Sequence, residues 1–239
     1  MGVQAFFMMI DPLYLIMVTP CLILAMLAQL WVKTSFAKYS RLRSVRGMSG
    51  AEAARRILES QGVRDVEVEI SPGGMLSDHY DPTAKVLRLS PEVYHGRSLA
   101  ALGVAAHEAG HAVQHAFGYV PLHLRTLMAP AVMVGGYVAP LMVLLGAVLQ
   151  HPSLLLIGLL GFAAITVFSL ITLPVELNAS KRAMQLLLSE GIIYDEEAPG
   201  ARAVLRAAAM TYVAAAIEAL VILLYYFLRY GGMLQRRDD

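Results

Sequence analysis

Five consecutive residues near the middle of the chain combine two histidines and a glutamate at a spacing suited to metal chemistry. The run is His107-Glu108-Ala109-Gly110-His111, an H-E-x-x-H pattern. On a helix, residues four apart lie on one face, so both imidazoles can reach one ion. Glu108 would lie beside a water in the open coordination position and act as its general base. The pattern predicts a catalytic zinc site with His107 and His111 as ligands.

The residues around this motif favour a buried helix. Residues 98–116 are rich in alanine and leucine and poor in β-branched side chains. The alternative is a solvated helix that carries two histidines and a glutamate without a metal. The apolar neighbours argue against it, because burying imidazoles and a carboxylate without partners costs free energy.

The composition places this motif in a membrane protein. The chain of 239 residues is 57% hydrophobic and 15% charged, with a mean hydropathy of +0.59. Four segments have the ~20 apolar residues that span a bilayer: residues 13–32, 126–149, 152–173 and 208–230. The second and third are so close in sequence that they should form a tight helical hairpin. Buried helices of a soluble protein are a poor alternative, because too little polar sequence remains to cover them.

The charged residues predict an orientation in the membrane. Five basic residues follow the first apolar segment: Lys33, Lys38, Arg41, Arg43 and Arg46. By the positive-inside rule, the region after this segment is cytoplasmic and the N-terminus is outside. The segment has no basic n-region and no evident cleavage site, so it should remain as an anchor. A net charge of +1 gives no reason to expect nucleic-acid binding, and the single Cys21 excludes an intramolecular disulfide.

The region between the first two apolar segments has the pattern of a small α+β domain. Ser49 and Glu52 form a capping box, which predicts a helix to about Ser60. Residues 65–70 and 85–89 alternate apolar and polar side chains and predict two strands before the motif helix. A strand beside a catalytic helix can hold an extended peptide on its free edge. Residues 85–89 are therefore either the substrate-binding strand or a purely structural one.

These elements predict five regions. Residues 1–32 are the first transmembrane anchor, and residues 33–125 are a cytosolic α+β region that ends in the motif helix. Residues 126–173 form the transmembrane hairpin, residues 174–207 a cytosolic helical segment, and residues 208–239 the fourth span with a short tail. The predicted fold class is mostly α, a multi-pass membrane protein with four transmembrane helices.

A catalytic zinc needs a third protein ligand. His115 would lie about 12 Å along the helix axis from His107, so the two could not converge on one ion with His111. Glu176 is the other candidate, because it follows the third apolar segment at the membrane face where the motif helix lies. From its position alone, Glu176 is equally well interpreted as a zinc ligand or as a solvated interfacial carboxylate.

Four stretches of the chain resemble one known family, the YugP-type membrane zinc metallopeptidases of bacteria. They are Ser77-Asp78-His79-Tyr80-Asp81-Pro82, Ala106-His107-Glu108-Ala109-Gly110-His111, Tyr119-Val120-Pro121-Leu122 and Leu173-Pro174-Val175-Glu176. The resemblance implies a zincin-like cytosolic portion that holds one Zn²⁺ per chain, with Glu176 as the third ligand. It also implies a location in the bacterial cell membrane, with the active site facing the cytoplasm and a protein or peptide as substrate.

One position departs from the family pattern. The family tends to carry aspartate two residues after the ligand glutamate, where this chain has Asn178. If that residue orients a ligand histidine, the neutral amide would weaken metal binding, unless Ser180 takes the role.

Three further polar residues have open roles. His79, with its aspartate neighbours, either contacts substrate or belongs to a turn, and the turn is the favoured interpretation. Tyr212, near the cytoplasmic end of the fourth segment, is a candidate donor to a developing oxyanion. Glu218 is a carboxyl within that segment, where it marks a functional site or makes a structural hydrogen bond.

The predicted function is a membrane-embedded zinc metalloendopeptidase that hydrolyses peptide bonds at the cytoplasmic membrane surface. Two other classes stay open. A membrane scaffold with an inactive site would bind zinc without turnover, which the intact Glu108 argues against. A quality-control subunit would be active only with a partner. The natural substrate and the oligomeric state do not follow from the sequence.

Overall fold

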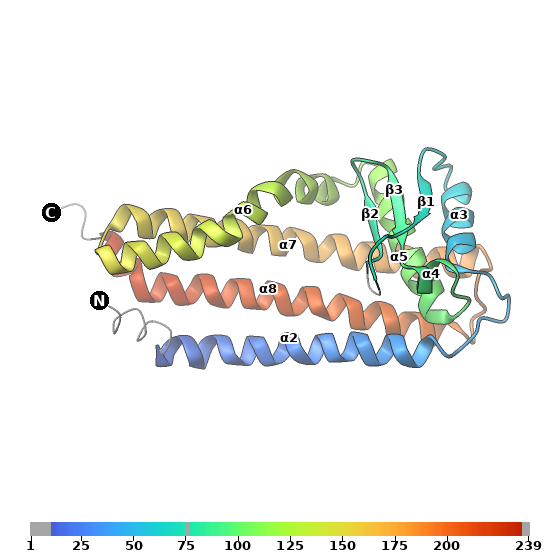
Figure 1. Cartoon of the computed structure of the whole chain (residues 1–239), viewed down its shortest axis with the longest axis horizontal. Coiled ribbons are helices and arrows are strands. Elements are labelled where there is room, and N and C mark those ends of the chain that lie inside the picture. Colours follow the sequence, from blue (N-terminus) through green and yellow to red (C-terminus); the bar gives the residue numbers. More distant parts are fainter. Residues whose placement is uncertain (1–10, 75–76, 236–239) are drawn as a thin grey trace. The chain divides into compact units, whose positions relative to one another are not determined.

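The computed structural model of the chain describes residues 11–74 and 77–235. Figure 1 shows a mostly helical chain with one small sheet. Four helices are long and apolar enough to cross a membrane: α2 (Pro12–Tyr39), α6 (Val120–Leu149), α7 (Pro152–Ser189) and α8 (Ala198–Gln235). The predicted fold class is therefore confirmed, and the chain is a mostly α multi-pass membrane protein.

The long helices continue past the ends of the apolar segments. Helix α7 passes through Pro174 and ends only at Ser189, although the apolar segment ends at residue 173. A proline removes one backbone donor, but good helix formers such as alanine, leucine, lysine and glutamine follow it and continue the helix. Glu176 consequently lies within a continuous helix and has its orientation fixed by that helix.

The chain divides into two compact units. One comprises residues 1–27, 124–173 and 212–239, of which residues 1–10 and 236–239 lie outside the described part. The other comprises residues 28–123 and 174–211.

The first unit contains the predicted tight hairpin between α6 and α7. Gln150 makes the turn with a φ of 51°, and Pro152 starts the second helix. The helices pack closely at Gly158, where an added Cβ would lie 2.9 Å from the backbone nitrogen of Val143. The hairpin prediction is confirmed.

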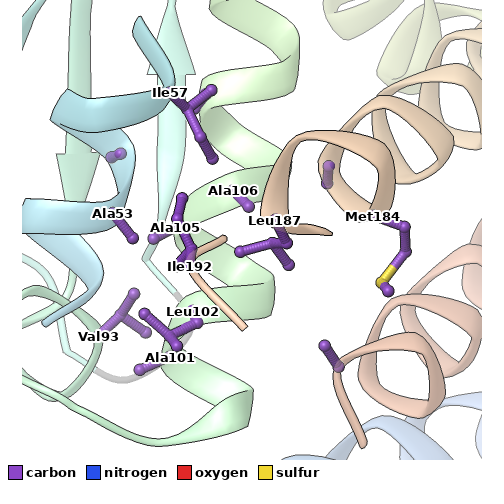
Figure 2. Close-up of a cluster of buried hydrophobic side chains, with 14 of the residues drawn as sticks. Ala53, Ile57, Val93, Ala101, Leu102, Ala105, Ala106, Met184, Leu187 and Ile192 are labelled. Carbon is purple, nitrogen blue, oxygen red and sulfur yellow. The ribbon is translucent and has the colours of Figure 1, made fainter. Parts of the chain in front are cut away.

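The second unit is a small α+β domain built around one buried helix. Its elements are α3 (Gly50–Ser60), β1 (Glu67–Ile70), β2 (His79–Asp81), β3 (Val86–Leu89), α4 (Pro91–Tyr94) and α5 (Leu99–Ala116). Helix α3 begins with the predicted capping box, in which Ser49 Oγ accepts from the Glu52 amide at 3.2 Å. Figure 2 shows the core, where Ile57 of α3, Leu102 of α5 and Leu187 of α7 are fully buried.

The sheet corrects the expectation for residues 85–89. Its strand order is β1-β3-β2, with β3 parallel to β1 and antiparallel to β2. Strand β3 therefore has partners on both sides and no free edge for a substrate. The two edge strands are β1 and β2, and β2 has only three residues, too few to show an alternating pattern in the sequence.

Candidate metal centre

Helix α5 presents the H-E-x-x-H residues from the middle of the second unit. Its N-terminus is capped by Ser98, whose Oγ accepts from the Ala101 amide at 3.2 Å. Most of the helix is buried, and Glu108 and His111 are buried with it. The predicted burial of the motif is confirmed. These polar side chains therefore need partners within the protein or a bound ion.

Gly110 allows α7 to approach the motif helix. A Cβ added at Gly110 would lie 2.9 Å from the carbonyl oxygen of Ala179, closer than a carbon and an oxygen normally come. Ala179 lies one turn after Glu176 on α7, so this close packing brings the Glu176 carboxylate to the histidines. The glycine inside the motif is thus a packing residue for the site.

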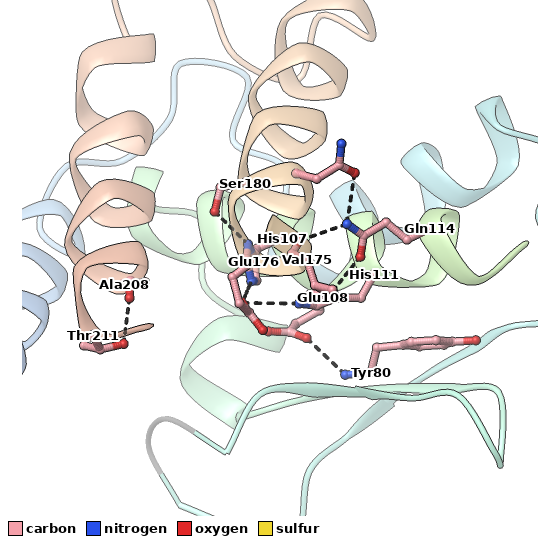
Figure 3. Close-up of polar contacts among 11 residues, drawn as sticks. Tyr80, His107, Glu108, His111, Gln114, Val175, Glu176, Ser180, Ala208 and Thr211 are labelled. Carbon is pink, nitrogen blue, oxygen red and sulfur yellow. Dashed lines mark hydrogen bonds and ion pairs between the residues drawn. The ribbon is translucent and has the colours of Figure 1, made fainter. Parts of the chain in front are cut away.

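Two imidazoles and one carboxylate converge at this crossing. His107 Nε2 lies 3.1 Å from Glu176 Oε2, and His111 Nε2 lies 3.6 Å from the same oxygen. Glu176 is only 1% exposed. One ligand atom from each of the three residues lies within 4.8 Å of the other two. Figure 3 shows the three side chains pointing toward one another from α5 and α7.

Gln114 orients His111 through a buried hydrogen-bond chain. Gln114 Nε2 donates to the Val175 carbonyl and to Asn178 Oδ1, each at 2.9 Å. Its Oε1 therefore faces His111 Nδ1, at 3.0 Å, and must accept the proton from that nitrogen. His111 Nε2 is left with a lone pair directed toward Glu176, which is the tautomer that a metal ligand requires.

Asn178 and Ser180 of α7 make hydrogen bonds to Gln114 and His107 of α5. Asn178 Oδ1 accepts from Arg182 Nε at 2.8 Å as well as from Gln114. Asn178 therefore contacts Gln114 and no histidine, so it acts on His111 only through Gln114. Ser180 Oγ lies 3.2 Å from His107 Nδ1 and can accept its proton, again leaving Nε2 free to bind an ion.

Glu108 is held in place by a hydrogen bond from strand β2. Its Oε2 accepts from the Tyr80 backbone amide of β2 at 3.0 Å (Figure 3). Burial raises the pKa of the Glu108 carboxyl to about 7, and the nearby Glu176 carboxylate adds to the rise. A carboxyl that titrates near neutral pH is well matched to taking up and giving back a proton.

These residues fit a zinc ion. In a tetrahedral site with metal–ligand bonds of about 2.0 Å, ligand atoms lie roughly 3.3 Å apart, and the two measured distances of 3.1 and 3.6 Å bracket this value. The donor set of two neutral imidazoles and one carboxylate is typical of catalytic zinc. A cation would also balance the buried negative charge of Glu176, which neutral imidazoles do not.

Other residues singled out from the sequence lie elsewhere. His79 is exposed and is the first residue of β2, with its Nδ1 2.8 Å from the carbonyl oxygen of Ser77, and its role stays a prediction. His115 Nδ1 is 2.8 Å from the Tyr80 hydroxyl and does not join the three converging groups. Tyr212 and Glu218 belong to the other unit, and their proposed roles stay predictions. Gln114 was missed because its contacts join residues about 60 positions apart, which no local pattern reveals.

Comparison with known proteins identifies the family of the chain. Residues 14–231 match the family described as "Putative neutral zinc metallopeptidase". The chain belongs to this family. It is also 47% identical to the "Putative membrane protease YugP" of Bacillus subtilis (strain 168), over 95% of this chain and 99% of that protein. No solved structure matches the chain. The family resemblance stated from the sequence is confirmed, and the family makes zinc the expected metal.

Proposed function

We propose that the chain is a zinc-dependent metalloendopeptidase that hydrolyses peptide bonds of protein substrates. The observation that carries this proposal is the convergence of His107 Nε2, His111 Nε2 and the Glu176 carboxylate, with Glu108 next to the first ligand on the same helix. We assign the three converging residues as ligands of one Zn²⁺ per chain.

Glu108 carries out the proton transfers of the proposed reaction. Zinc bound here would lower the pKa of a water and polarise the scissile carbonyl. Glu108 takes the proton from the attacking water and later donates it to the leaving amine. Because the Tyr80 amide occupies Oε2, Oε1 is the oxygen that carries this proton.

The edge strand β2 is the proposed support for the substrate backbone. The Tyr80 amide donates to Glu108 and not to β3, so the edge of β2 at Tyr80 is turned toward the catalytic base. An extended peptide added along this edge would have its backbone next to Glu108. This assignment takes the place of the one made for residues 85–89.

We also propose that the second unit faces the cytoplasm and that the N-terminus lies outside the bacterial cell membrane. The support is the group of basic residues that follows the apolar part of α2. The enzyme would then cut at the membrane surface, because the H-E-x-x-H helix precedes α6 and is not part of a candidate span.

The test compares detergent-purified wild type with Glu108→Gln in a casein-cleavage assay, with zinc content measured on the same samples. Glu59→Gln, which changes an exposed glutamate of α3, is the matched control. We expect all three proteins to bind zinc and only Glu108→Gln to lose cleavage, by a factor of about 100 or more.

Three results would favour another account. Equal cleavage by wild type and Glu108→Gln would show that Glu108 is not the general base. Zinc binding without cleavage in wild type, also after native membranes are added back, would favour the scaffold. Cleavage that appears only with those membranes would favour the partner-dependent subunit.

A further inference from the structure

A basic groove lies in the second unit, away from the metal centre. It has a volume of about 670 Å³ and is lined by the end of α2, the segment that follows it, and the residues around α4. Four of its lining side chains are basic and one is acidic: Lys33, Arg41, Arg43, Arg97 and Glu92. All five are exposed. This volume is typical of sites for small ligands.

The positive charge of the groove is not neutralised by the protein. Among the described residues, no salt bridge involves Lys33, Arg41 or Arg43. Arg97 donates to the backbone carbonyl of Gly47 and interacts electrostatically with Glu52, with which it forms no salt bridge among the described residues. The sequence from Lys33 to Gly50 contains no aspartate or glutamate. An anion bound in the groove would thus lie near several cationic side chains and few competing carboxylates.

The groove starts where the apolar part of α2 ends. Helix α2 is a candidate membrane span, and Lys33 is its first charged residue after a long apolar run. Phe36 and Ala37, one turn later, give the groove an apolar wall next to its basic one. A site with both walls at the end of a span suits a molecule that has an anionic head and an apolar chain.

We propose that this groove binds an anionic phospholipid. The phosphate of the headgroup would contact Arg41 and Arg43, whose guanidinium groups match phosphate oxygens in geometry. The first methylenes of the acyl chain would lie against Phe36. Such binding would anchor the second unit to the membrane surface through lipid charge.

A tryptophan placed in the groove can report lipid binding. Trp31 is the only tryptophan of the chain, and it is not among the residues that line the groove. The reporter protein is therefore Trp31→Phe/Phe36→Trp, which moves the tryptophan to the apolar wall of the groove. In nanodiscs of mixed phosphatidylcholine and phosphatidylglycerol, bromine atoms can be placed on the acyl chains of either lipid. If the groove selects phosphatidylglycerol, the tryptophan fluorescence of the reporter protein will be quenched more strongly by the brominated anionic lipid than by equal brominated phosphatidylcholine.

Two double variants distinguish lipid binding in the groove from general electrostatic attraction to an anionic membrane. Arg41→Gln/Arg43→Gln should lower the preference for phosphatidylglycerol roughly 25-fold, since each basic residue near the membrane contributes roughly fivefold. The control, Arg56→Gln/Arg64→Gln, removes the same charge from exposed positions outside the groove and should keep the preference. Equal melting temperatures in phosphatidylcholine nanodiscs would show that both variants fold.

Three outcomes would overturn the proposal. Equal quenching by the two brominated lipids in the reporter protein would show that the groove does not select charge. An equal loss of phosphatidylglycerol preference in both double variants would show general electrostatic attraction to the membrane and no specific site. Equal quenching by the two lipids, together with calorimetric binding of inorganic phosphate that is lost in Arg41→Gln/Arg43→Gln, would show that the groove binds free phosphate and not a lipid.

Discussion

Gln114 is the residue on which the orientation of the metal centre depends most. It is completely buried, and three of its hydrogen bonds join His111 to the backbone and side chains of α7. Because both of its amide hydrogens are already used, Gln114 can only accept from His111. The side chain thereby fixes both the ring orientation and the tautomer of His111, a proposed zinc ligand.

Gln114→Ala should weaken zinc binding roughly 10- to 100-fold, the usual effect of removing a residue that orients a ligand histidine. The measurement is a competition titration against a chromophoric zinc chelator. Gln185→Ala, at an exposed position of α7, is the control and should bind zinc like wild type. Unchanged affinity in Gln114→Ala would show that His111 does not depend on this hydrogen bond.

At the scale of elements, the site depends on how closely α5 and α7 pack. Gly103→Ala and Gly110→Ala make the same change on the same helix. A Cβ at position 103 would lie 3.6 Å from the Ala201 carbonyl oxygen, an ordinary contact, whereas a Cβ at position 110 would lie 2.9 Å from that of Ala179. The two variants thus distinguish a general effect of alanine on helix α5 from a specific effect on the packing of α5 against α7.

Gly110→Ala should destabilise the protein by about 1–3 kcal/mol, because overpacking forces the backbones apart. It should also weaken zinc binding by moving Glu176 away from the histidines. The measurements are the melting temperature without metal and the zinc affinity. Equal values for Gly103→Ala and Gly110→Ala would contradict the packing role of Gly110.

The edge strand makes a second prediction at this scale. Tyr80→Pro removes the amide that holds Glu108, at an edge position where proline is tolerated. Since a hydrogen bond to a charged group contributes about 1.5–3 kcal/mol, kcat/KM should fall roughly 10- to 100-fold with zinc content unchanged. Tyr80→Phe keeps the amide, removes only the hydroxyl contact with His115, and should stay close to wild type. Equal losses in the two variants would place the effect in the hydroxyl contact with His115 and not in the amide.

The elements were predictable from sequence where the signal is local. The apolar segments, the capping box at Ser49 and the helical motif each follow from residues close together in the chain. Strand β2 was not predictable, because three residues carry no usable period, and the role of the free edge was therefore given to β3. The passage of α7 through Pro174 was hidden because a proline usually marks a helix boundary.

At the scale of the whole molecule, the proposed topology can be tested through the single cysteine. In a Cys21→Ser background, His151→Cys lies in the turn between α6 and α7, and Ser60→Cys lies at the exposed end of α3. A membrane-impermeant maleimide should label His151→Cys in intact cells and Ser60→Cys only after permeabilisation. Labelling of Ser60→Cys in intact cells would place the second unit outside.

The central claim is that His107, His111 and Glu176 hold one zinc ion. Its most direct test is the zinc-to-protein ratio, measured by mass spectrometry after dialysis against a weak chelator. Wild type, Glu108→Gln and the control Glu196→Gln, an exposed glutamate, should each retain about one zinc per chain. Glu176→Gln should retain far less, because it removes the only charged ligand. A Glu176→Gln protein that keeps as much zinc as wild type would contradict the account.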